Sequence, residues 1–451
     1  MIERILANIT LNDARSVEMS NLIRREVRRL KLLCLAVLIL VVLIGLLSAT
    51  ACTNTPPVDT GPDTAPKADP LLLEIPSLKA PPPVRVWLRS MSELSSLQVK
   101  GAGLLRDGDS TRELAKAWSG EVRAEGDALV LAPEASGAGQ LRVKALSFGP
   151  ASQHCSLNGN DFEGAIRIEA KSGKLSIINT VDIEAYCRGS VGWEAIPSWH
   201  SEALKAQAVA IRTYTLFTIY HNQASGVDRN WDVDDTTRFL RYGGLGPTGS
   251  PNLRKASEKV IRAVKDSAGE VMLHKGKIFK AFFASNSGGH SASVATGFGL
   301  AAIPPLRGVD LGDYGKASSL YRWKRTKQRT AIETLLDKAG QGVGHLSSIT
   351  VETNDPSGFV QRVVLVGSLR SRTLSAADFR RILGTGPDGL PSTNFSVEFS
   401  GDEIDFHGRG WGHGVGMDQW ASQGMAQAGM GYRDILGRHY PETNVLRPWT
   451  E

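Results

Sequence analysis

The segment Gly192–Tyr214, GWEAIPSWHSEALKAQAVAIRTY, places one carboxylate, Glu194, directly before an alanine-rich helical pattern. Pro197 disfavours helical geometry in the residue before it, so we expect Glu194 in a constrained loop. Residues 202–220 then predict a helix with Ser201 as its N-cap. Small and apolar side chains recur on one face of this helix, at Leu204, Ala208, Ile211 and Thr215.

Glu194 is the strongest candidate for a catalytic acid. Trp193, Ile196 and Trp199 would surround its carboxyl group with apolar surface and raise its pKa by desolvation. A carboxylic acid that stays protonated near neutral pH can protonate a glycosidic oxygen. The alternative is an ordinary solvated glutamate before a helix. No partner carboxylate stands at a fixed spacing, and three others are candidates only because they are acidic: Asp232, Asp234 and Asp235.

The rest of the chain predicts an α+β fold, a strand-rich body with a few packed helices. Alternating apolar residues start at Val84, and short strand-like runs separated by Gly and Ser turns continue to about Pro150. Two strands flank Ser172-Gly173, and residues 255–290 read as a helix, a glycine turn and two strands. Later elements are a helix at 331–340 and strands near 348–352 and 359–366.

Four regions follow from this pattern. Residues 1–51 are a signal peptide or membrane anchor, and 52–83 are a tether rich in Pro, Asp and Thr. Residues 84–150 are a small strand-rich region without a catalytic cluster. Residues 151–451 are the body that carries the candidate site.

The N-terminal region has the pattern of an export signal. Five basic residues between Arg24 and Lys31 precede the apolar run Leu32–Leu47, and small residues then lead to Cys52. A cysteine after small residues resembles a bacterial lipobox, so we expect Cys52 to be lipidated. The alternative is an uncleaved anchor, although the run is short for the roughly 17–25 residues of a membrane span. Both readings place the body outside the cytoplasm, on the outer face of a bacterial membrane.

Composition excludes several other classes of function. The formal net charge is +6, much of it in the N-terminal region, and no basic cluster interleaved with aromatic residues indicates nucleic-acid binding. The sequence predicts no cofactor and no metal site. Cys155 and Cys187 could form a disulfide in an oxidising compartment. A metal site that adds His154 is the competing reading, but no CxxC or HExxH spacing supports it.

The segment 408–416, GRGWGHGVG, has glycine at every second position. If it is extended, one face is bare backbone and the other presents Arg409, Trp411, His413 and Val415. These side chains would suit an anionic sugar through ring stacking, carboxylate pairing and hydrogen bonds. The alternative is a glycine-rich turn that packs the tryptophan into the core. The GxGxG spacing is not a dinucleotide-binding fingerprint.

A second polar segment, Ser285–His290, follows the apolar strand pattern of residues 279–284. Polar loops at strand ends are common positions for site residues, and they are equally common as plain turns. No GxSxG elbow is present, so a serine hydrolase is not indicated.

Taken together, three ordered blocks resemble the SpoIID/LytB family of peptidoglycan proteins. They are VGWEAIPSWHSEALKAQAVAIRTY at 191–214, FFASNSGGHS at 282–291 and GRGWGHGVGMDQWASQGMAQAGMGYRDILGRHYPET at 408–443. With the preceding VDIEAYCRGSV they span roughly residues 160–445.

The resemblance implies a lytic transglycosylase in which Glu194 is the single catalytic residue. Such an enzyme cleaves the MurNAc–GlcNAc bond of glycan strands without a water nucleophile, so it needs no second carboxylate. By the same resemblance the substrate-binding residues are Trp193, Arg212, Ser287, His290, Arg409, Trp411, His413 and Gln419. The alternative within the family is a glycan-binding protein that modulates a cell-wall amidase.

The sequence departs from the family pattern at two places. Ala195-Ile196-Pro197 replaces a Met-Pro turn, which shifts the proline by one residue. Leu240 or Arg241 stands where the family has a glutamine before Tyr-Gly-Gly. The zinc known in the family has no matching Cys/His set in this sequence.

Overall fold

The computed structural model describes residues 71–76, 79–101, 103–107, 110–113, 118–134, 139–149, 155–247, 255–353 and 355–449. All of them belong to one unit of the chain, Ala68–Glu451. The predictions for the signal or anchor, for Cys52 and for most of the tether lie outside the described residues. In this part of the chain, every helix falls short of the combined length and hydrophobicity of a membrane span.

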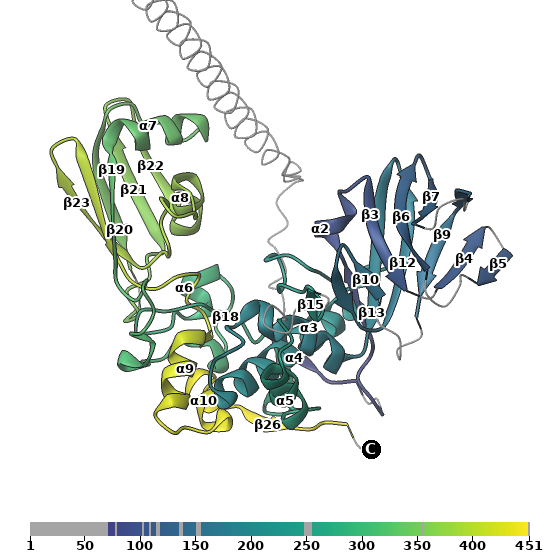
Figure 1. The fold of residues 1–451 in the computed structure, drawn as a ribbon. Coiled ribbons are helices and arrows are strands. Elements are labelled where there is room, and N and C mark those ends of the chain that lie inside the picture. Colours follow the sequence, from purple (N-terminus) through teal and green to yellow (C-terminus); the bar gives the residue numbers. More distant parts are fainter. Residues whose placement is uncertain are drawn as a thin grey trace, which may run out of the picture. The chain divides into compact units, whose positions relative to one another are not determined.

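Two seven-stranded sheets form the strand-rich region (Figure 1). The first has the order β15-β11-β10-β3-β6-β7-β8: Gly246–Pro247, Asn160–Phe162, Cys155–Leu157, Ser96–Gly101, Trp118–Glu125, Ala128–Pro133 and Leu141–Val143. The second has the order β14-β2-β13-β12-β9-β4-β5: Val233–Asp234, Val84–Trp87, Lys174–Val181, Ala165–Lys171, Ala145–Phe148, Gly103–Asp107 and Ser110–Glu113. A short helix, α2 (Arg89–Ser92), follows β2.

Alternating burial along these strands builds one shared core. In β2, Val84 and Val86 are fully buried, whereas Arg85 and Trp87 lie on the opposite face and are only half-buried. This is the period of two that a strand with one solvated face requires. Strands on both sides of residue 150 contribute to the same core, so the strand-rich region packs directly against the start of the predicted body.

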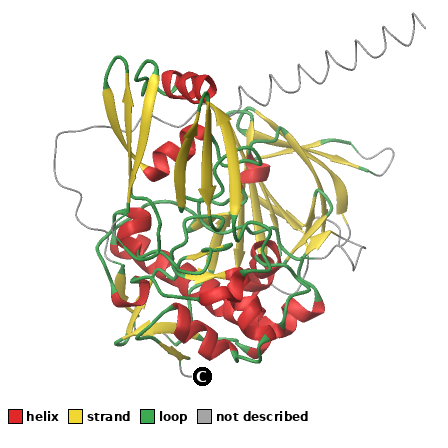
Figure 2. Cartoon of the chain, turned by 90° about the vertical axis from the view of Figure 1, so that its left-hand side faces the viewer, coloured by secondary structure: helices red, strands yellow, loops and turns green. Residues whose placement is uncertain are grey.

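Helices gather in a second region (Figure 2). The long helix α4 (Ser201–Ala224) contacts α3 (Ile183–Glu194), α5 (Glu258–Asp266), α9 (Gln419–Gln427) and α10 (Tyr432–His439). Its alanines allow this close packing because they add little bulk between helices, and Ala203, Ala206, Ala208 and Ala210 are all buried. A four-stranded sheet lies against α4, in the order β1 (Leu72–Glu74), β17 (Lys277–Phe279), β16 (Val271–His274), β26 (Asn444–Leu446).

A third core lies within residues 323–406. Two three-stranded sheets build it: β19 (Trp323–Gln328), β24 (Glu403–Gly408) and β23 (Phe395–Ser400), and then β20 (Leu346–Glu352), β21 (Arg362–Gly367) and β22 (Ser371–Ser375). Helices α7 (Arg329–Lys338) and α8 (Ala376–Leu383) pack against them (Figure 1). The segment before this core contains α6 (Val294–Phe298) and two 3₁₀ turns, Pro304–Leu306 and Gly312–Gly315.

The prediction of a mixed α+β fold is confirmed. The helix predicted at 202–220 is present and longer, but its N-cap is His200 rather than Ser201. The Nδ1 atom of His200 accepts a hydrogen bond from the Glu202 N–H over 3.3 Å. The loop predicted for Glu194 is wrong, because Glu194 is the last residue of α3.

Candidate functional site

Glu194 owes its position to the end of helix α3. Asp182 caps the start of that helix by accepting hydrogen bonds from the Glu184 and Ala185 N–H groups. Near its end, a side chain at Gly192 would collide with the Lys255 carbonyl oxygen, 1.8 Å from an added Cβ. The helix stops at Ala195, whose backbone is extended. The carboxyl group of Glu194 is therefore carried by a packed helix end, a mount that restricts its movement.

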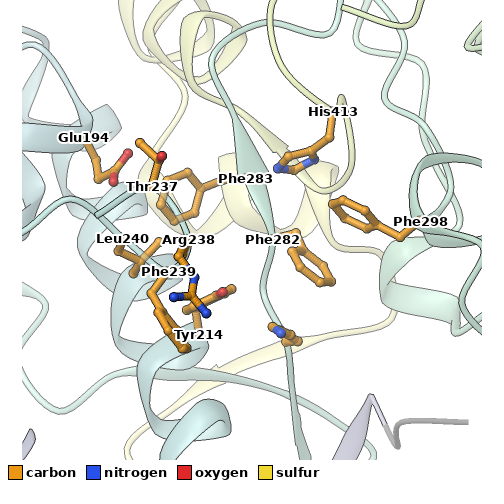
Figure 3. A pocket seen from close by; sticks show the side chains of 11 residues that line it. Glu194, Tyr214, Thr237, Arg238, Phe239, Leu240, Phe282, Phe283, Phe298 and His413 are labelled. Carbon is orange, nitrogen blue, oxygen red and sulfur yellow. The ribbon is translucent and has the colours of Figure 1, made fainter. Parts of the chain in front are cut away.

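The Glu194 side chain lines a pocket of about 330 Å³ (Figure 3). Figure 3 places Glu194 and His413 on opposite sides of this pocket. Of the described residues that line it, Glu194 alone carries a carboxyl group. The others are Tyr214, Thr237, Arg238, Phe239, Leu240, Lys280, Phe282, Phe283, Phe298 and His413.

Burial in this pocket raises the pKa of Glu194 above its ordinary value of 4.5. The Arg241 backbone N–H donates a hydrogen bond to Oε1, and together with the Arg241 charge it opposes the shift, but desolvation is the larger effect. Apolar walls of this kind disfavour the charged carboxylate. The geometry thus favours a protonated acid that faces an open cavity.

Different residues from those predicted supply the apolar walls. Trp199 is buried and packs edge-on against Trp420, with ring centroids 5.1 Å apart. Ile196 is exposed. The indole N–H of Trp193 donates to the Gly244 carbonyl over 3.1 Å. None of the three predicted residues lines the pocket, whose rings come instead from Phe239, Phe282, Phe283 and Phe298.

Gln419 holds the main chain of Glu194. Its Nε2 atom donates to the Glu194 carbonyl oxygen and to Gln207 Oε1, each over 3.1 Å. Gln419 is itself buried at the start of α9. It acts on Glu194 through the backbone and does not line the pocket, so the structure places it as a positioning residue.

The glycine-rich segment is not extended, so of the two readings the structure supports a glycine-rich turn, although Trp411 is exposed and not packed into the core. Gly410, Gly412, Gly414 and Gly416 have φ values of 74°, 106°, 71° and 76°, a region that favours glycine. At Gly416 an added Cβ would lie 1.9 Å from the Phe282 carbonyl oxygen. The glycines therefore allow this loop to approach the backbone of Phe282 closely.

His413 is the residue of this loop that reaches the pocket. Its Nδ1 atom accepts a hydrogen bond from the Val415 N–H over 3.1 Å, which leaves the other ring nitrogen to carry the proton in the neutral form. Desolvation lowers the pKa of His413 to about 4. The ring is therefore neutral near pH 7 and lies against Phe298, with centroids 4.8 Å apart.

Arg409 and Trp411 are exposed and do not line the pocket. Trp411 pairs through its backbone with Asn286, with hydrogen bonds of 2.7 and 3.1 Å. That pairing joins the glycine-rich segment to the loop at 285–290.

The loop at 285–290 is held by Asp418. The Ser287 N–H and hydroxyl both donate to Asp418 Oδ2 over 2.7 Å, and Ser287 is buried. Asp418 also caps α9 through the Ala421 N–H, and burial raises the pKa of Asp418 to about 6. His290 Nδ1 lies 2.8 Å from the Ser291 carbonyl oxygen, away from the pocket. The loop follows β18 (Phe283–Ala284), whose parallel partner is β25 (Met417–Asp418).

Arg212 lies in the core. Its side chain is fully buried, and two of its nitrogens bond Glu184 over 2.9 and 2.6 Å. A third donates to the Glu270 carbonyl oxygen over 2.9 Å. With its guanidinium group satisfied inside the protein, Arg212 is not placed to contact a substrate in the pocket.

The disulfide considered for Cys155 and Cys187 is not formed. Both are free, buried thiols, Cys155 in β10 and Cys187 in α3, and burial raises the pKa of each to about 12. Among the described residues, no group of three or more His, Cys, Asp or Glu side chains is arranged to hold a metal.

Sequence reasoning missed most of the pocket wall. Tyr214 lies in the segment 192–214 and Phe282-Phe283 in the segment 282–291. These side chains are aromatic rings, which by themselves do not distinguish a pocket wall from a buried core. In the segment 237–240 the sequence shows only a departure from the family pattern, at Leu240, and does not predict a pocket wall. The close approach of this segment to α3 depends on tertiary packing, which neither periodicity nor spacing encodes.

Comparison with known proteins gives two family matches. The family described as Stage II sporulation protein matches residues 171–274, which include Glu194. A domain of unknown function (DUF8618) matches residues 310–416, which contain the third core.

Several relatives match more than half of the chain. An uncharacterized protein of Brachyspira hyodysenteriae is 31% identical over 290 residues, 64% of this chain and 73% of the relative. Stage II sporulation protein D of Bacillus subtilis is 30% identical over 271 residues, 59% of this chain and 75% of the relative. The amidase enhancer of Bacillus subtilis is 22% identical over 302 residues, 57% of this chain and 40% of the relative. The chain therefore belongs to the SpoIID/LytB family.

Proposed function

We propose that this protein remodels the bacterial cell wall as a lytic transglycosylase, with Glu194 as its single acid and base. The observation that carries the proposal is the carboxyl group of Glu194, which faces a pocket with aromatic walls where its pKa is raised. A general acid must be protonated at working pH and must reach its substrate. The raised pKa of Glu194 favours the protonated form, and the pocket gives its carboxyl group access to a substrate.

The mechanism needs one carboxyl group. Protonated Glu194 gives its proton to the oxygen between MurNAc and GlcNAc as the bond from that oxygen to the MurNAc C1 breaks. The resulting carboxylate takes the proton of the MurNAc 6-hydroxyl, whose oxygen closes onto C1 as a 1,6-anhydro ring. The Arg241 N–H stabilises the carboxylate between the two steps. Water is not consumed, which fits a pocket whose described lining holds no second carboxylate.

His413 has a separate part in this proposal. As a neutral ring on the wall opposite Glu194, held by the backbone of Val415 and Phe283, it offers a sugar ring a flat contact surface without adding a positive charge (Figure 3). An imidazolium at the same place would favour ionisation of Glu194.

A second function, modulation of a cell-wall amidase, is favoured by the similarity to the amidase enhancer of Bacillus subtilis. In that case the pocket would bind glycan without cleaving it, and an amidase would be the protein's partner.

We also propose an extracytoplasmic location with an N-terminal lipid or membrane anchor, on the basis of the residues before and at Cys52. Replacing Cys52 by Ser should then abolish incorporation of a labelled fatty acid.

The test uses the protein on glycan strands stripped of stem peptides. Mass spectrometry should detect anhydro-sugar ends released by the wild type and not by Glu194→Gln, which retains the shape of the side chain and still binds the strands. Glu258→Gln is a matched control at the start of α5, outside the pocket, and should cleave like the wild type. Equal product from Glu194→Gln would overturn the enzyme and leave the amidase modulator.

A further inference from the structure

A second recess lies on the strand-rich region, outside the Glu194 pocket. It is a groove of about 940 Å³ across the solvated face of the second seven-stranded sheet. Trp87 of β2, Ile178 and Ser176 of β13 and Glu169 of β12 face it from neighbouring strands. Trp231, just before β14, closes one end.

Two tryptophans form an aromatic platform in this groove. The ring centroids of Trp87 and Trp231 lie 5.4 Å apart with an angle of 34° between the planes. The Arg229 guanidinium lies 3.6 Å over the Trp231 ring, and the Trp87 indole N–H donates to Ser92 Oγ over 3.0 Å. Both tryptophans remain only half-buried, so part of their apolar surface is available to a ligand. Indole faces are well suited to the C–H faces of sugar rings.

Polar groups of both signs surround the platform. The charged residues that line the groove are Glu93, Asp127, Lys144, Glu169, Lys171 and Lys174. These three acids and three bases balance, and Arg229 and Arg89 over the two tryptophan rings add two positive charges. Acids interspersed with bases do not form the continuous basic surface that a nucleic acid or an acidic lipid surface requires. Carboxylates, ammonium groups and an amide beside aromatic rings are instead the partners that sugar hydroxyl and acetamido groups require.

The groove is connected to the Glu194 pocket by one segment, residues 229–241. Trp231 lines the groove and Phe239 lines the pocket, and their rings meet edge-to-face with centroids 6.1 Å apart. Two residues after Phe239, the Arg241 N–H bonds the Glu194 carboxyl group. A polymer that rests on Trp231 therefore lies next to the wall of the pocket.

We infer that this groove is a second binding site for a pyranose glycan strand, which holds the polymer while one of its linkages lies in the Glu194 pocket. The identity of the strand rests on the proposed function, but the groove's affinity for sugar rings does not. The site would make the protein selective for long strands over short fragments.

Calorimetric titration of Glu194→Gln protein with denuded glycan strands tests the inference, because this background cannot consume the ligand. Adding Trp231→Ala should weaken binding by about tenfold, the scale of losing one aromatic anchor. Trp231 also touches Phe239, so Glu169→Ala provides a second variant on β12, three strands along the sheet from β14, and it should weaken binding severalfold. Glu398→Ala, an exposed carboxylate on β23, is the matched control and should bind like the parent. Unchanged affinity in both groove variants would overturn the inference.

Kinetics separate this inference from the proposed function. In the active background, Glu169→Ala, which lies outside the lining of the Glu194 pocket, should raise KM on long strands, while kcat and the cleavage of short fragments are retained. If the wild type releases no anhydro ends but the groove variants still weaken binding, the enzyme is wrong and the groove stands. If the wild type cleaves and neither KM nor binding changes in the groove variants, the groove is wrong and the enzyme stands.

Discussion

The side-chain amide of Gln419 donates a hydrogen bond to the main-chain carbonyl of Glu194, a residue 225 positions earlier, over 3.1 Å. Helix α9 thereby fixes the end of α3 that carries the candidate acid. The same amide nitrogen bonds Gln207 of α4, so three helices meet at one polar contact in the core.

Replacing Gln419 by Leu should lower kcat about tenfold and leave KM nearly unchanged, because the variant disturbs the acid and not the lining of the pocket. It should also cost about 1–2 kcal/mol of unfolding free energy, since the Glu194 carbonyl loses a buried donor. Steady-state kinetics and urea unfolding measure the two effects. Gln427→Leu, exposed at the end of the same helix, should change neither. A Gln419→Leu enzyme whose KM rises while kcat is kept would point to a direct substrate contact instead.

Replacing Gly416 by Ala should displace the pocket wall. The added methyl group would collide with the Phe282 carbonyl, in a backbone conformation with φ of 76°. We expect a loss of about 2 kcal/mol or more together with reduced activity. Gly401→Ala is the control: its φ is 64°, but nothing lies within 4 Å of the added Cβ, so only about 1 kcal/mol of backbone strain is expected. Equal losses in the two variants would contradict the close approach.

Replacing Arg212 by Met should destabilise the protein by about 3–5 kcal/mol, because it leaves Glu184 charged without its buried partner. Arg381→Met removes an exposed arginine from α8 and should cost less than about 0.5 kcal/mol. Chemical denaturation measures the unfolding free energy of both variants and of the wild type. An Arg212→Met protein of native stability that no longer binds glycan would restore the substrate contact predicted from the sequence.

Stability should depend on pH through His439. Its ring is buried, Nδ1 bonds the Ile435 carbonyl, and desolvation lowers the pKa from 6.5 to about 4. Below pH 6.5 the unfolded chain binds a proton at His439, whereas the folded chain binds it only near pH 4. The stability that the neutral ring contributes is therefore lost as the pH falls from 6.5 to about 4. His439→Met should flatten the decrease by about 1–3 kcal/mol.

Two other buried groups titrate in the same range. His413 acts in the same direction as His439, and Asp418, with its raised pKa, acts in the opposite one. The informative quantity is therefore the difference between wild type and His439→Met at each pH, measured by urea unfolding. A difference that stays constant from pH 7 to pH 4 would contradict the depressed pKa.

Local sequence patterns predicted the strands and helices, whereas the arrangement of the candidate site depends on tertiary contacts. The period-two run from Val84 and the helix in 202–220 follow from the sequence because each element shows its buried face in its own residues. The position of Glu194 at a helix end was not predicted: Pro197 indicated a loop, whereas α3 runs to Glu194 and the chain becomes extended at Ala195. The glycine pattern at 408–416 read equally well as a strand or a turn, and the positive φ values decide for the turn.

The candidate acid was identified from the sequence, but its surroundings were not. Trp193 and Trp199 are close to Glu194 in sequence but do not line its pocket. Phe239 and Phe282, which are distant in sequence, supply the pocket wall instead. The separate core at 323–406 was also not predicted, since residues 151–451 were expected to form one body.

The central claim is that burial in a pocket with aromatic walls raises the pKa of the Glu194 carboxyl group and so favours its protonated form. An NMR titration of ¹³C-labelled glutamate carboxyl groups, with the signal assigned by its absence in Glu194→Gln, measures this directly. The account predicts a pKa above the ordinary 4.5 and a cleavage rate that falls as pH rises through it. A Glu194 carboxyl group that titrates at or below 4.5 would contradict the account.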